Sequence, residues 1–196
     1  PEAQKHFESY LSKYGKGGGF DLFIKAHLKV AQTLKAQGQK AQVEKVRLQK
    51  AAEALSWYKR TVQAYNTLTD DEKTKVTAAG LAAAAEARFE EGDAILEEMR
   101  KVKLPQNKDK MAEAIQTKLK LMKSSREMFA SVEVFGQPHW TIAAFSRQGA
   151  GLAELATSIE NAPVPAGFTQ DQKDFFQSGL MEKAQPTWNA AKEEFR

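Results

Sequence analysis

Apolar residues recur every three or four positions along most of this chain, and short polar or glycine- and proline-containing stretches interrupt the pattern. This spacing places apolar side chains on one face of an α-helix. Short connections between helices are typical of antiparallel neighbours. The pattern predicts an all-α protein without strands, with helices over residues 2–14, 20–37, 39–68, 69–102, 108–135, 139–160 and from 169 to the last turn around Phe195.

Turn and capping signals refine these boundaries. Thr69 and Glu72 have the spacing of a capping box, which predicts the start of one long helix that runs to residue 102. The run of small residues over 78–85 lets a neighbouring helix approach closely within that helix. Gly38 indicates a tight turn between the second and third helices.

The stretch from residue 139 to 176 organises the chain, because two apolar helices meet there at a proline-rich link. We expect the link over 161–168 to be ordered and extended, because each proline fixes its own φ and biases the residue before it. A proline inside the last helix should kink that helix. We assign structural roles, and no ligand, to Trp140, Arg147, Gly151, Pro163, Pro165, Thr169 as the helix cap with Gln172, and Pro186.

Charge is unevenly distributed. Residues 86–98 carry a net charge of −5, and residues 101–126 carry +6 from eight Lys/Arg and two acids. One interpretation is an antiparallel hairpin in which the two faces pair, with Asp93 near Lys118, Glu90 and Glu91 near Lys120, and Glu86 near Lys123. The alternative is a nucleic-acid or anionic-surface binding site on the basic segment. No aromatic residues interleave with these lysines as they do in single-strand binders, so we favour the pairing.

Composition gives no support for catalysis. The 196 residues include no Cys, which excludes disulfides, thiolate metal sites and Cys nucleophiles. The glycines of 15–19 lack the preceding strand and the Lys-Ser/Thr sequel of a phosphate loop. The histidines His6, His27 and His139 lie on three different predicted helices, so a metal site would depend on the fold to gather them. We expect no enzyme activity, no cofactor and no metal.

A resemblance extends over residues 83–195. The residues that carry it are Arg88-Phe89, Lys103-Leu104-Pro105, His139-Trp140 with the following Thr-Ile-Ala-Ala, Arg147-Gln-Gly, Leu155-Ala, Glu160-Asn-Ala-Pro163-Val-Pro165, Phe168-Thr-Gln-Asp-Gln-Lys and Glu182-Lys-Ala-Gln-Pro186. This order resembles tetratricopeptide-repeat proteins of predatory and gliding bacteria that are linked to adventurous gliding motility. Residues 1–70 match only as generic repeat-like hairpins.

The resemblance implies a non-enzymatic protein–protein interaction scaffold within a bacterial cell-envelope complex, in the periplasm or at the outer membrane. The sequence does not exclude a cytoplasmic location, because no signal peptide or membrane-spanning run is visible. A strict 34-residue period is absent, so we expect an elongated, tetratricopeptide-like α-solenoid array of antiparallel hairpins with irregular long helices. It would fill residues 1–196, with a possible subdivision into 1–68 and 69–196. Because the chain begins at Pro1 and stops within a helical pattern at Arg196, we expect a fragment of a longer protein with further repeats. The partner and the oligomeric state are not set by the sequence.

Overall fold

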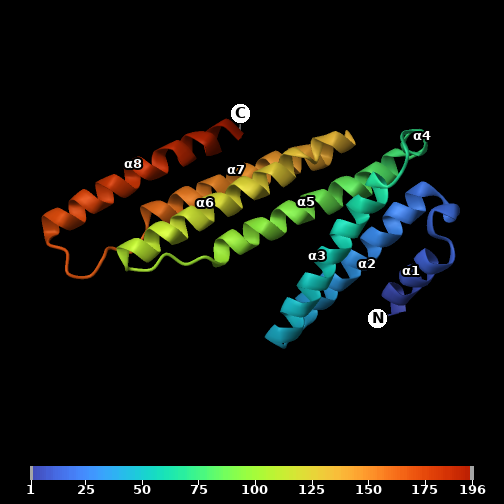
Figure 1. Cartoon of the computed structure of the whole chain (residues 1–196), viewed down its shortest axis with the longest axis horizontal. Helices are drawn as coiled ribbons and strands as arrows, with labels where there is room; N and C mark the ends of the chain where they lie inside the picture. Colours follow the sequence, from blue (N-terminus) through green and yellow to red (C-terminus); the bar gives the residue numbers. More distant parts are fainter. Residues whose placement is uncertain (1, 195–196) are drawn as a thin grey trace. The chain divides into compact units, whose positions relative to one another are not determined.

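The computed structural model describes residues 2–194, and every regular element within that range is helical (Figure 1). The prediction of an all-α fold is confirmed. The elements are α1 (Glu2–Lys13), the 3-10 turn η1 (Gly15–Gly18), α2 (Phe20–Lys40), α3 (Glu44–Asn66), α4 (Asp70–Lys73), α5 (Ala78–Lys101), α6 (Lys108–Ala130), the 3-10 turn η2 (Glu133–Phe135), α7 (Pro138–Glu160) and α8 (Gln170–Glu194). Phe195, predicted on the last helix, lies outside the described residues. In residues 2–194 no helix is both long and apolar enough to cross a bilayer.

The chain divides into two compact units. The first unit is Pro1–Glu91 with Ser131–Thr141, and the second is Gly92–Ala130 with Ile142–Arg196. Helices α5 and α7 therefore each supply residues to both units. The prediction of one array with a possible division after residue 68 stays a prediction.

The first unit is built on the pairing of α2 with α3, and α1 packs against α2 (Figure 1). The core side chains Ile24, Val30 and Leu34 of α2 are almost completely buried. Their spacing is the helical period that the sequence shows. The first part of α5 adds alanines 83–85 and 87 to the same core, each at most 4% exposed. Of the run of small residues predicted to allow close packing, residues 80 and 83–85 are buried, whereas Ala78 and Ala79 are exposed.

Gly38 does not form a turn, and that prediction was wrong. Helix α2 continues through Gly38 to Lys40, and α3 begins only at Glu44. A Cβ added at Gly38 would lie 3.1 Å from the Cβ of Lys50 and 3.4 Å from the carbonyl oxygen of Arg47. The glycine therefore gives α3 room to approach α2, which outweighs its unfavourable helix propensity.

The predicted helix over 69–102 is interrupted, which is a second correction. Its start is as expected, because Thr69 and Glu72 form a complete capping box. However, α4 ends at Lys73 and α5 begins at Ala78. Thr77 caps the new helix, because its hydroxyl accepts a hydrogen bond from the Ala79 backbone N–H at 3.2 Å. The Asp21 carboxylate of α2 holds this cap by accepting hydrogen bonds from the Thr77 backbone N–H at 2.9 Å and the Thr77 hydroxyl at 2.5 Å. Local sequence rules could have identified Thr77 as a helix cap, whereas its contact with Asp21, 56 residues away, could not be predicted from them.

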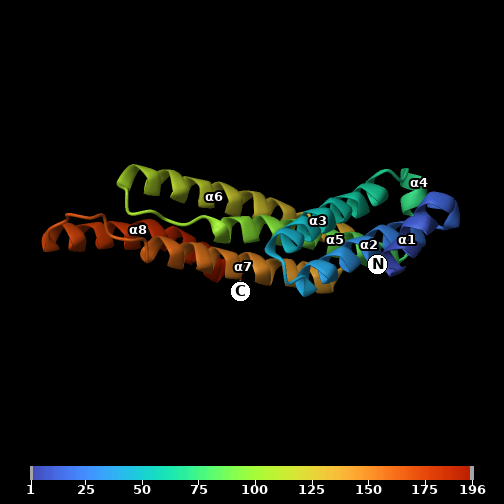
Figure 2. The same cartoon turned by 90° about the horizontal axis from the view of Figure 1, so that it is seen from below.

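The second unit contains the last part of α5 together with α6, α7 from residue 142, and α8. Successive helices run in opposite directions, and α7 lies alongside both α6 and α8 (Figure 1 and Figure 2). Ser125 of α6 donates a hydrogen bond to the Gly92 carbonyl oxygen of α5 at 2.8 Å. A Cβ at Gly92 would meet the Phe129 ring at 2.9 Å. These contacts fix the register of the α5–α6 pair.

That register contradicts the predicted charge-matched hairpin. Lys118, expected beside Asp93, lies beside Met99, six positions further along α5. Asp93 instead pairs with Arg147 of α7 at 2.5 Å. Glu86 and Glu90 bind Gln32 and Lys35 of α2. Glu91 pairs with Arg88 of its own helix. The physical reason is the non-helical connection over 102–107, which is longer than a tight turn and shifts α6 relative to α5.

The residues assigned structural roles have defined surroundings. Trp140, in the first unit, is half-buried with its ring centroid 5.4 Å from that of Phe89. Arg147 binds Asp93 and lies 3.6 Å from Glu97. Gly151 is buried, and a Cβ there would lie 2.8 Å from Leu96 Cδ1 of α5. A larger side chain at position 151 would thus push α5 and α7 apart.

Two buried residues, a glycine in a left-handed conformation and a helix cap define the link between α7 and α8. Ala162 and Pro165 are buried, and Gly167 adopts a left-handed φ of +84° that other residues rarely tolerate. The Thr169 hydroxyl accepts from the Gln172 backbone N–H at 3.4 Å, and the Gln172 side chain accepts from the Thr169 N–H at 2.9 Å. This reciprocal cap confirms the predicted helix start. Pro186 lies inside α8, and the predicted kink there stays a prediction.

Candidate functional site

The described residues do not form a group of three or more His, Asp or Glu side chains that could hold a metal ion. His6 and His139 are exposed. His27 is packed between the rings of Phe23 and Trp57, and its Nδ1 is 2.8 Å from the Phe23 carbonyl oxygen. Burial lowers the pKa of His27, partly opposed by that hydrogen bond. This histidine therefore belongs to the packing between α2 and α3.

Three of the eight cations of the basic segment make contacts within the chain, while the side chains of Lys103, Lys108, Lys110, Lys120 and Lys123 are exposed. Lys118 is only 4% exposed and donates to a backbone carbonyl. Lys101 pairs with Glu98, and Arg126 pairs with Glu194 at 2.8 Å. These contacts reduce the number of solvent-facing cations on which the anionic-surface alternative depends.

A cleft lined by aromatic residues lies at the beginning of α8, and we call it the aromatic cleft. Its volume is about 530 Å³. The lining residues of the aromatic cleft are Phe168, Asp171, Gln172, Phe175, Phe176, Gly179, Leu180 and Lys183, with Lys108 from the start of α6. Phe175 is 83% exposed, although a phenylalanine gains free energy by leaving water. Phe175 differs from a single exposed apolar residue because other aromatic and apolar side chains adjoin it in the cleft, and contiguous exposed apolar patches are typical of interaction surfaces.

Helix geometry explains why the cleft forms there. Leu180 is buried, and it fixes which face of α8 packs against the unit. The Phe176 ring packs against the Phe168 ring in an edge-to-face arrangement, with ring centroids 5.9 Å apart. Phe175 precedes Phe176 by one position, which corresponds to a rotation of about 100° around the helix. It therefore points away from the packed face.

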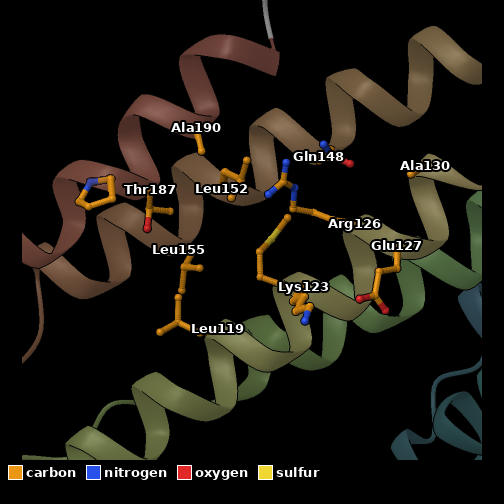
Figure 3. Close-up of a pocket in the computed structure, with 12 residues that line it drawn as sticks. Leu119, Lys123, Arg126, Glu127, Ala130, Gln148, Leu152, Leu155, Thr187 and Ala190 are labelled. Carbon is orange, nitrogen blue, oxygen red and sulfur yellow. The ribbon is translucent and has the colours of Figure 1, made fainter.

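A second cleft, which we call the Gln148 cleft, lies between α6, α7 and α8 (Figure 3). It also has a volume of about 530 Å³. Met122, Leu152 and Leu155 among its lining residues are buried. Lys123, Glu127 and Arg126 line it from α6, and Thr187 and Ala190 line it from α8. It is a largely apolar hollow with charged margins.

The polar end of the Gln148 cleft is occupied by the chain itself. The Gln148 amide donates to the Glu194 carboxylate, which also accepts from Arg126. Figure 3 shows Arg126 and Gln148 approaching each other from α6 and α7. The Gln148 Oε1 atom is buried and has no hydrogen-bond partner within the described chain. Glu194 therefore pairs with the Gln148 amide nitrogen and with Arg126, while the amide oxygen of Gln148 is left without a partner in the described chain.

Comparisons with known proteins give no match: no family model, no curated protein and no solved structure is similar to this chain.

Of the residues that we singled out from the sequence, Pro186 lines the Gln148 cleft and Thr169 caps the helix that carries the aromatic cleft. The remaining residues of that set line neither cleft: Trp140, Arg147, Gly151, Pro163 and Pro165. Sequence reasoning did not identify Phe175 and Phe176 as site residues and missed the exposure of Phe175. The available signal was their adjacency, because two neighbouring residues cannot both point to a narrow buried face.

Proposed function

We propose that this chain is a non-enzymatic protein–protein interaction scaffold that binds through the aromatic cleft of α8. The observation that carries the proposal is the 83% exposure of Phe175 beside a concave surface formed by Phe168, Phe176 and Leu180. Aromatic side chains at the centre of an interface dominate binding free energy when a partner removes them from water. Lys108, Lys183 and Asp171 provide the polar margin that such interfaces have.

The broader assignment rests on the resemblance. We propose a tetratricopeptide-like helical array that serves a bacterial cell-envelope or gliding-motility machinery, in the periplasm or at the outer membrane. Two features support this proposal: the ordered residue matches over 83–195, and the succession of long antiparallel helices from α5 to α8. Arrays of this kind offer extended surfaces for other proteins.

Site-specific photo-crosslinking tests the proposal. The photoreactive amino acid benzoylphenylalanine is placed at Phe175 in the full chain in its source cells, and at Val134 as a matched control. Val134 is a suitable control because it is an apolar residue that is 77% exposed and lies outside the cleft. We expect crosslinked protein adducts from position 175 that position 134 does not give. Equal adducts at both positions, or none at 175, would contradict the proposed binding surface.

A further inference from the structure

The surface of α8 that carries the aromatic cleft has a projection and a gap next to each other. Phe175 projects into solvent, and Gly179 follows it one helical turn later on the same face. A Cβ placed at Gly179 would meet nothing within 4 Å. The glycine is therefore not required by packing within the chain, although it lowers helix stability by up to about 1 kcal/mol relative to alanine. An open glycine in mid-helix suggests that another surface approaches here.

Two opposite charges lie on either side of this pair of residues. Asp171 precedes Phe175 by one turn, and Lys183 follows Gly179 by one turn, and both line the aromatic cleft. Within the described chain, neither side chain makes an ion pair or a side-chain hydrogen bond. One face of α8 thus carries, in order, an acid, an aromatic ring, a glycine and a base, spaced by four residues each.

This order is self-complementary in one orientation. Position 177 is the midpoint between residues 175 and 179, and also the midpoint between 171 and 183. When a second α8 lies antiparallel across the first with their midpoints aligned, Phe175 lies at the level of the partner's Gly179. In the same arrangement Asp171 lies at the level of the partner's Lys183. A two-fold axis repeats both contacts, as in an isologous dimer.

We propose that the occupant of the aromatic cleft is a second copy of this chain, bound through antiparallel packing of α8 on α8. The inference rests on the proposed function, because it names the partner of the same surface. A parallel arrangement would put Asp171 at the level of the partner's Asp171, and the two carboxylates would repel each other. It would also place the two bulky Phe175 rings at the same level and leave the gap at Gly179 unfilled. One helix pair buries less surface than a standard stable interface, so the dimer should be reversible and concentration-dependent.

Sedimentation velocity over a range of concentrations tests this proposal on the full chain. We expect a monomer–dimer equilibrium that Asp171→Lys and Lys183→Glu each weaken about tenfold or more, because each change creates two like-charge contacts per dimer. The double variant D171K/K183E should recover association, because it exchanges the charges without changing the pairing. Monomer at all concentrations, or single reversals that the double variant does not rescue, would overturn the antiparallel pairing.

Gly179→Leu separates association from folding. Because the position is open and helical, the leucine should leave the fold intact and raise the melting temperature of the monomer. It would nevertheless fill the gap that receives the partner's Phe175 and reduce dimer formation at least tenfold. Val134→Ser is the matched control and should change nothing. Unchanged association in Gly179→Leu would contradict the proposal.

The two proposals fail in different ways. A strictly monomeric chain whose position 175 still crosslinks to another protein would remove the second copy as occupant and leave the scaffold function in place. Absence of both association and crosslinks would remove both.

Discussion

Lys118 of α6 donates a hydrogen bond from Nζ to the carbonyl oxygen of Met99, 3.0 Å away in the last turn of α5. The side chain is buried, and burial lowers the pKa of Lys118 from its ordinary value. The last carbonyl groups of a helix lack intrahelical partners and carry partial negative charge. Lys118 therefore caps α5 from a neighbouring helix, which explains why a cation is found in the core of this unit.

Replacing Lys118 by Met should lower the free energy of unfolding by about 1–3 kcal/mol, because methionine keeps most of the volume but cannot donate to the Met99 oxygen. Urea titration at neutral pH measures the change. Lys120→Met is the control: Lys120 is exposed on the same helix, and its replacement should change stability by no more than about 0.5 kcal/mol. Equal effects of the two substitutions would show that the capping contact contributes nothing.

The Asp93–Arg147 ion pair provides a test of the helix register. A double-mutant cycle with Asp93→Asn and Arg147→Gln should give a coupling free energy of about 0.5–1 kcal/mol, since the two groups lie 2.5 Å apart and are partly buried. A parallel cycle with Asp93→Asn and Lys118→Gln should give none, because Lys118 lies beside Met99. Coupling in the second cycle and not in the first would restore the charge-matched hairpin.

Asp21 should stabilise the start of α5 from a distance. Asp21→Ala removes the acceptor of two hydrogen bonds from Thr77, and we expect a loss of about 1–2 kcal/mol, as for other helix caps. Thermal or chemical unfolding followed by circular dichroism checks the value. Asp70→Ala serves as a comparison at a fully solvent-exposed acid, where the loss should be smaller. A smaller loss at Asp21 than at Asp70 would argue against the remote cap.

His27 should make stability depend on pH. Burial is the largest cause that lowers its pKa below the ordinary value of 6.5, and the nearby Arg60 acts in the same direction. The unfolded chain therefore binds a proton more readily than the folded chain, so stability is full above about pH 6.5 and is lost as pH falls below that value. His27→Gln should flatten this dependence between pH 7 and pH 5, measured by urea unfolding at each pH. His6→Gln, at an exposed site, should leave the slope unchanged.

Local signals in the sequence were sufficient where the cause of a structure lies within a few residues. The capping boxes at Thr69 and Thr169 were predictable, because both partners are three positions apart. The apolar period of each long segment also predicted correctly that the segment is helical. The proline-containing link before Thr169 was also recognisable from sequence alone.

Features that depend on distant partners were not predictable. The contact of Asp21 with Thr77 at the start of α5 joins residues 56 positions apart, and the role of Gly38 depends on the approach of Lys50. The α5–α6 register depends on how far the 102–107 connection extends, which charge patterns do not specify. The exposed position of Phe175 required knowing which face of α8 Leu180 buries. In each case a tertiary contact outweighed or supplemented a local preference.

The first unit also constrains the order in which the protein can fold during synthesis. Phe135 is buried, and its ring lies 5.3 Å from that of Tyr65, although 69 residues separate them in the chain. Residues 92–130, which belong to the other unit, must therefore leave the ribosome before this aromatic contact can form. The N-terminal helices are synthesised first, but their core is complete only after residues 131–141 have been synthesised. Nascent chains stalled before residue 131 should consequently be more sensitive to proteases than chains released beyond residue 141.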